Sequence, residues 1–166
     1  HSRIHALIAL LKKPVAGIND VRSLKIRTGG GIAEAVANAI GASAFVKPAP
    51  ESYELLNSGV ADGVFFPKEA AVAFKLVPLI KHITYIPGGL FCTSFTLIMN
   101  EAKWKQISAA DQALLEKIMG EPMARRAGKA WDAADARGEK ALRDADVAVV
   151  TASPQFVAEI RERTAG

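Results

Sequence analysis

The sequence predicts an α/β fold with a mainly parallel sheet. Two observations support this prediction. Short apolar runs alternate along the chain with longer segments of helical composition, which is the pattern of strand–helix–strand units. Glycine and proline separate these segments, as expected where the chain passes between elements. The chain has 166 residues, half of them apolar and 23% charged, which is the composition of one globular domain.

The apolar runs predict the strands. They lie at residues 24–28, 44–47, 63–66, 83–86, 90–100 and 147–151. Residues 63–66 are apolar throughout, which is typical of a strand buried on both faces. Residues 90–100 form the longest run, about 33 Å if fully extended, a length that suits a strand shared between two lobes. Residues 1–13 could form a helix or a strand, because a short apolar run does not distinguish the two.

The segments between these runs predict helices. They lie at residues 31–40, 51–58, 69–81, 108–120, 122–145 and 153–163. Gly41 is expected to end the first helix, and Pro78 to kink or end the third. Ser108 and Asp111 form a variant of the capping box, and Pro122 fits the first turn of the next helix. Residues 14–20 read as a connection.

Charge and hydropathy exclude two broad functions. Lys plus Arg total 21 against 17 Asp plus Glu, and the resulting +4 is scattered along the chain. The densest basic clusters, Lys12-Lys13 and Arg125-Arg126, are dipeptides without aromatic neighbours, so no nucleic-acid partner is expected. No apolar run approaches the roughly 18 residues of a membrane span.

The sequence carries no motif for metal, cofactor or catalysis. Because Cys92 is the single cysteine of the sequence, no internal disulfide can form. Cys92 is expected to be a small buried core residue. The dinucleotide fingerprint, counted from Gly29, ends on Glu34, whose carboxylate would repel a pyrophosphate. Among the three histidines, His1 and His5 have i, i+4 spacing, but no His-Glu-x-x-His pattern surrounds them, so surface positions are favoured over metal ligands. Asp132 and Asp135 fit a solvated helix face better than a catalytic carboxylate pair. We therefore expect no enzyme, no metal site and no cofactor.

Arg27 is the residue that suggests a function. It ends a predicted strand, and Gly29-Gly30-Gly31 leads from it into a helix start. A guanidinium offers a planar fork for a carboxylate, and a helix N-terminus adds N–H donors and partial positive charge. A structural ion pair with Asp62 or Glu34 explains the residue equally well. Local pattern leaves both interpretations open.

A wider set of residues resembles a known family. The set comprises Asp20-x-x-x-x-Lys25-Ile26-Arg27, Gly41-Ala42, Tyr53-x-x-Leu56-x-x-Gly59-Val60-x-Asp62-Gly63, Pro67, Met99-Asn100, Trp104, Ser108-Ala109-Ala110-Asp111 and Gly128-Lys129-Ala130-Trp131-Asp132. Together these residues resemble the solute-binding subunit of TRAP (tripartite ATP-independent periplasmic) transporters. The resemblance runs from about residue 14 to the end of the chain and covers the C-terminal half of such proteins.

The resemblance implies a fold and a role. The fold is the C-terminal lobe of a type II periplasmic-binding-protein-like α/β protein, with a crossing strand, a long helix and the first lobe largely missing. We expect residues 1–19 to connect the lobes, 20–92 to form the lobe core, 93–125 to reach toward the first lobe, and 126–166 to form the long helix and a strand–helix return. The role is periplasmic capture of an organic acid for a membrane permease.

The resemblance also implies site residues. The arginine at the position of Arg27 forms a salt bridge to the substrate carboxylate. Phe65, Phe66 and Pro67 stand where many members carry Gln-Glu-Asn-Pro, so Phe66 replaces a ligand-binding asparagine with an apolar wall. We expect an acid with an apolar or aromatic body, and only one of the two phenylalanines facing it. Phe91 and Thr93, on the crossing strand, are expected to add an aromatic wall and a hydroxyl.

Two alternatives accompany this interpretation. The same α/β binding-protein fold could serve a ligand-sensing domain or an enzyme. A fragment of this kind could also bind nothing alone, because half a cleft buries too little ligand, and form a homodimer that covers its exposed interface.

Overall fold

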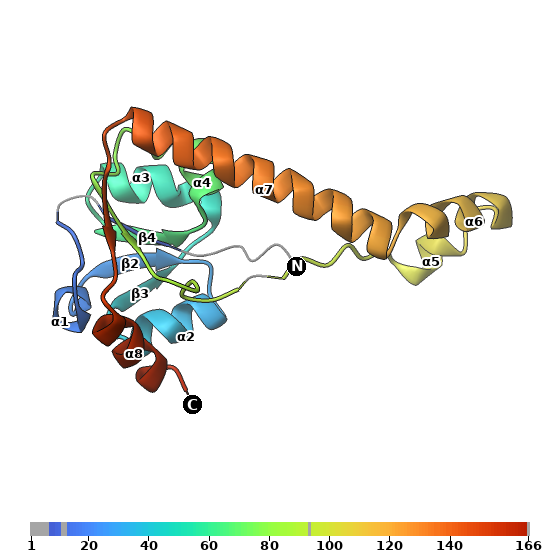
Figure 1. Cartoon of the computed structure of the whole chain (residues 1–166). Coiled ribbons are helices and arrows are strands. Elements are labelled where there is room, and N and C mark those ends of the chain that lie inside the picture. The colour runs from blue at the N-terminus through green and yellow to red at the C-terminus, as the bar shows by residue number, and fades with distance from the viewer. Residues whose placement is uncertain (1–6, 11–12, 93, 166) are drawn as a thin grey trace.

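The computed structural model describes residues 7–10, 13–92 and 94–165, and they form one layered α/β unit with a long projecting helix (Figure 1). A six-stranded sheet has the order β3-β2-β4-β1-β5-β6. Its strands are β1 (Leu7–Leu10), β2 (Lys25–Thr28), β3 (Ser43–Val46), β4 (Gly63–Phe66), β5 (His82–Tyr85) and β6 (Ala148–Thr151).

The sheet is mainly parallel, as predicted. Strand β2 pairs in parallel with β3 and β4, and β5 pairs in parallel with β6. Strand β1 runs antiparallel to both of its neighbours, β4 and β5. Residues 7–10 of the ambiguous N-terminal run therefore form a strand, and this strand joins the two parallel groups into one sheet.

Helices cover both faces of the sheet. They are α1 (Ile18–Val21), α2 (Ile32–Ala39), the short 3-10 helix η1 (Ala49–Glu51), α3 (Ser52–Asn57), α4 (Lys68–Ala73), α5 (Glu101–Trp104), α6 (Ala109–Ile118), α7 (Glu121–Asp144) and α8 (Pro154–Arg163). One core cluster joins α1, α2 and α8 to the sheet through residues such as Val21, Val36 and Phe156. The other joins α3, α4 and the end of α7 through Leu56, Ala71 and Leu142. Figure 1 shows these two layers on opposite sides of the strands.

The long strand predicted at residues 90–100 is wrong. The described residues of this segment form no strand, and residues 94–100 are exposed. In Figure 1 the segment leads from the sheet toward α5 and α6, at the far end of α7. A strand needs the N–H and C=O groups of a neighbour, and within the described part of the chain no strand pairs with this segment.

Two helix predictions also need correction. The helix expected at residues 69–81 is α4, which stops at Ala73. Lys75 then adopts a positive φ of 57°, a conformation that a continuing right-handed helix does not allow, and Pro78 follows. The short helices α1 and α5 were not predicted, and α1 begins within residues 14–20, which were expected to form only a connection. Helices α2, α3, α6, α7 and α8 match the predicted segments within about three residues.

Thr84 ties the chain after β1 to the sheet. The side chain is fully buried, and its Oγ1 donates to the Val15 carbonyl at 2.7 Å and accepts from the Val15 N–H at 3.3 Å. We expect Thr84→Val to keep the volume but leave both backbone groups unpaired in the core, at a cost of about 1–3 kcal/mol in unfolding free energy. Urea denaturation measures this. Thr151→Val, at an exposed position, is the control, and an equal loss in both variants would contradict the assignment.

Candidate ligand-binding site

A hollow of about 610 Å³ lies where β2 and β4 end. We call it the Arg27 hollow. Its lining comprises Arg27, Gly29, Gly30, Ile32, Ala33, Ala49, Phe65, Phe66, Pro67, Glu69, Phe74, Phe91, Cys92, Ser94, Phe95 and Trp131. Five of the six residues predicted for the site line this one hollow. The sixth, Thr93, lies outside the described residues.

Arg27 is held by the backbone and leaves part of its guanidinium free. The residue is 3% exposed, and its Nε and Nη2 donate to the Lys47 carbonyl at 2.9 and 2.5 Å. Within the described ranges, no hydrogen bond or ion pair engages Nη1. Asp62, proposed as an ion-pair partner, instead accepts from the Lys25 N–H at 2.9 Å. The structural ion pair with Asp62 or Glu34 is therefore not formed.

Burial makes the guanidinium charge costly. Desolvation lowers the pKa of Arg27 to about 10, and the negative charge of Glu51 partly opposes this shift. Arg27 still carries its proton at neutral pH. A buried cation with unused N–H donors favours an anion, because a carboxylate would restore the interactions lost with water.

Aromatic rings surround the guanidinium. The Arg27 Cζ lies 4.5 Å from the centre of the Phe66 ring, and Phe66 stacks on Phe74 at 5.4 Å. Phe65 points to the other face, where it is 2% exposed within the core and lies 6.4 Å from Phe91. The two side chains alternate as expected, with Phe65 in the core and Phe66 half-buried, but the expectation that only one of them faces the hollow is wrong. Both residues line the hollow.

Helix α7 contributes Trp131 to the lining of the hollow, a residue that local sequence patterns did not predict for the site. Trp131 stacks on Phe95 at 5.2 Å with an interplanar angle of 16°, and both line the hollow. Trp131 is 104 positions after Arg27 in the chain, so no local pattern could join them. Its presence in the family-like motif was the one available signal.

The first turn of α2 also contributes to the lining of the hollow. Ile32 and Ala33 line the hollow, so the partial positive charge of this helix start adds to that of Arg27. Gly30 has a φ of +85°, and a Cβ placed there would meet Val46 at 3.3 Å. Glycine is needed here for both reasons.

The position of Cys92 differs from the predicted one. It was expected in the core but is exposed and lines the hollow. The prediction failed because it assumed a paired strand at 90–100, and this segment leaves the sheet instead.

Two acidic residues meet between α4 and α7. The Glu69 N–H donates to Asp135 Oδ1 at 3.1 Å, so Asp135 binds the first turn of α4 and does not lie on a purely solvated face as predicted. Burial raises the pKa of Glu69, and the negative charge of Asp135 adds to the shift. Glu69 lines the Arg27 hollow.

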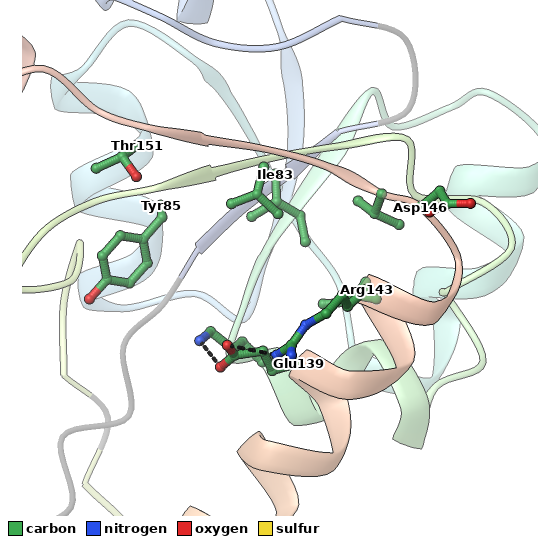
Figure 2. Close-up of a pocket in the computed structure, with 10 residues that line it drawn as sticks. Ile83, Tyr85, Glu139, Arg143, Asp146 and Thr151 are labelled. Atoms are coloured by element: carbon green, nitrogen blue, oxygen red, sulfur yellow. Dashed lines mark hydrogen bonds and ion pairs between the residues drawn. The ribbon is translucent and has the colours of Figure 1, made fainter.

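A second hollow of about 570 Å³ lies between the end of α7 and strands β5 and β6 (Figure 2). Its cations are already engaged: Lys68 and Arg143 bind Glu139 at 2.6 and 3.3 Å. The hydrogen bond from Lys68 lowers the pKa of Glu139. Because this carboxylate already occupies both cations, the second hollow is a poorer site for an anionic ligand than the Arg27 hollow.

A metal site and a membrane span each have requirements that the described ranges do not meet. Within them, no group of three or more His, Cys, Asp or Glu side chains could hold a metal ion. No helix found there has the length and hydropathy of a membrane span.

Comparison with known proteins gives a consistent picture. Residues 7–165 match the family of bacterial extracellular solute-binding proteins, family 7. A TRAP periplasmic solute-binding protein from Bordetella bronchiseptica, with bound (R)- and (S)-mandelate, is 46% identical with a TM-score of 0.93, over 98% of this chain and 51% of that one. A marine metagenome TRAP protein specific for aromatic acids, in complex with 3-hydroxybenzoate, is 27% identical with a TM-score of 0.92, over 99% and 52%.

A curated relative has a different ligand in its name. The C4-dicarboxylate-binding periplasmic protein DctP of Rhodobacter capsulatus is 30% identical over 149 residues, which are 89% of this chain and 43% of the relative. The chain thus spans about half the length of the proteins it matches. These proteins bind solutes and are not enzymes.

Proposed function

The chain belongs to family 7 of the bacterial extracellular solute-binding proteins, the family of the TRAP binding proteins, and from this premise we propose that it captures an organic acid with an aromatic body. Arg27 forms the salt bridge to the ligand carboxylate. The aromatic side chains of the hollow hold the ligand body.

One observation carries this proposal: Arg27 is buried, charged and only partly engaged, and it lines a hollow together with aromatic rings. A charge-assisted hydrogen bond contributes roughly 1.5–3 kcal/mol, and a bidentate carboxylate more. The rings of Phe66, Phe91 and Trp131 favour a flat apolar body. A sugar acid would leave several hydroxyl groups facing these rings without hydrogen-bond partners, which is costly.

The relatives support the aromatic body. The Bordetella protein holds mandelate, and the metagenome protein holds 3-hydroxybenzoate; each is a carboxylic acid that carries a benzene ring. The 46% identity to the Bordetella protein extends over nearly the whole of this chain.

Delivery to a TRAP permease completes the proposed role. In this role the protein works in the periplasm, and a first lobe like that of the longer relatives closes over the hollow. Residues 94–100 carry exposed apolar side chains, among them Phe95, Leu97 and Ile98, and these suit such a lobe interface. Residues 93–125 are thus proposed to belong with the first lobe, and pairing of two chains stays a prediction.

Phe66→Asn tests the aromatic body. It removes the ring against Arg27, a contact of about 1 kcal/mol, together with apolar contact to the ligand. We expect benzoate affinity to fall by about tenfold or more, since 1.4 kcal/mol is tenfold. Tryptophan fluorescence can follow the titration, because Trp131 lines the hollow whereas Trp104 lies on the distant α5.

The controls for this titration separate binding from folding. Phe45→Asn changes a phenylalanine of β3 that does not line the hollow, and it should leave benzoate affinity unchanged. Selective binding of a sugar acid such as glucuronate by the unmodified protein would sink the aromatic-body proposal.

A further inference from the structure

We propose that Glu69 determines which acids the Arg27 hollow accepts, by receiving a hydrogen bond from a hydroxyl on the ligand ring and repelling a second carboxylate. The ligand class is then a ring-hydroxylated aromatic monocarboxylate. This inference rests on the proposed function, because it places the ligand carboxylate on Arg27.

The first support is the position of Glu69. It is half-buried, lies in the first turn of α4 two positions after Pro67, and lines the same hollow as Arg27. In the described part of the chain, no hydrogen bond or ion pair engages its carboxylate; its N–H is the bonded group. The neighbouring cation, Lys68, is taken by Glu139 at 2.6 Å. The Glu69 carboxylate is therefore available to a ligand.

The second support is the charge around Glu69. Asp135 binds the Glu69 N–H, so a second carboxylate lies beside the first. The raised pKa of Glu69 follows from burial and from Asp135, which indicates that no nearby cation compensates its charge. Arg27 and Glu69 make no ion pair in the described structure. The lining of the hollow thus carries a positive group on Arg27 and a negative group on Glu69, together with several aromatic rings.

This polarity orders the ligands by their ring substituent. With the ligand carboxylate on Arg27, a ring hydroxyl donates to Glu69, and such charge-assisted bonds are among the stronger hydrogen bonds. An unsubstituted ring would leave the Glu69 carboxylate partly desolvated and without a hydrogen-bond donor. A second carboxylate meets two like charges and is repelled. The expected order of affinity is hydroxybenzoate, then benzoate, then benzenedicarboxylate.

The test is a calorimetric titration of the full-length gene product with a matched ligand set. The set is 3- and 4-hydroxybenzoate, benzoate, and benzene-1,3- and 1,4-dicarboxylate, which differ only in one ring substituent. We expect the better hydroxybenzoate to bind about tenfold tighter than benzoate. We expect each dicarboxylate to bind at least about tenfold weaker than benzoate.

The variant Glu69→Gln tests whether Glu69 is responsible for this order of affinities. The change keeps the N–H that binds Asp135, so the seating of α4 and the melting temperature should stay unchanged. In this variant the ratio of benzoate affinity to dicarboxylate affinity should fall by about tenfold. The ratio of hydroxybenzoate affinity to benzoate affinity should fall to about threefold or less. Glu54→Gln, an exposed residue of α3, is the matched control and should change neither preference.

The outcomes separate this inference from the proposed function. If the unmodified protein binds benzoate as tightly as both hydroxybenzoates, or if Glu69→Gln keeps the full order, the role of Glu69 is wrong while aromatic-acid binding stands. If no aromatic acid binds, both proposals fail.

Discussion

Gly138→Ala is expected to lower the unfolding free energy by about 3 kcal/mol or more. Gly138 is buried in the interior of α7, where that helix packs on α4. A Cβ placed there would clash with the Lys68 carbonyl oxygen and lie 2.8 Å from the Glu69 nitrogen. Both are backbone atoms, so the clash cannot be relieved by a side-chain rotation. The helices must separate, and this outweighs the gain of about 1 kcal/mol in helix propensity.

Urea denaturation of the two proteins measures the loss. Gly17→Ala is the control, because its added Cβ meets no atom within 4 Å and its φ of −158° suits any residue. Ligand affinity should fall together with stability, since α4 carries Glu69 and follows Pro67 in the Arg27 hollow. A Gly138→Ala variant as stable as the unmodified protein would contradict the close packing of α4 on α7.

Arg27→Ala is expected to weaken aromatic-acid binding by ten- to a few hundredfold. The range follows from roughly 1.5–3 kcal/mol for a charge-assisted hydrogen bond, somewhat more for a bidentate pair, and 1.4 kcal/mol per tenfold change. Arg27→Lys should recover part of the loss, because it keeps a positive charge without the planar fork. Calorimetric titration with benzoate gives both values.

Arg143→Ala provides the matched arginine control. Arg143 lines the second hollow and binds Glu139, so its removal should leave benzoate affinity unchanged. A melting curve of Arg27→Ala shows whether the variant is folded, since it loses two hydrogen bonds to Lys47. A folded Arg27→Ala variant with unchanged affinity would show that Arg27 does not bind the carboxylate.

The sequence predicts those parts of the fold that local interactions determine. Strands β2, β3 and β4 and helix α2 match the predictions closely, because each is a short patterned run bounded by glycine or proline. The strand expected at residues 90–100 fails for the opposite reason. Its apolar pattern is suitable, but pairing depends on a distant partner, and a pattern within the segment carries no information about that partner.

The candidate site divides in the same way. Arg27 lies near the end of β2, and Phe65, Phe66 and Pro67 lie at the end of β4, the parallel neighbour of β2, so motif and strand order bring them together. Trp131 reaches the hollow from the middle of α7, which local patterning could not place against β2. Glu69 lies in α4 and Phe74 directly follows that helix, but no local pattern orients α4 toward Arg27. Contacts between distant elements therefore required the structure.

The most direct measurement is a calorimetric titration of the full-length gene product with benzoate beside D-glucuronate. Capture of an aromatic acid through Arg27 predicts saturable one-to-one binding of benzoate, with D-glucuronate at least about tenfold weaker. Equal affinity for the two acids, or a preference for D-glucuronate, would contradict it.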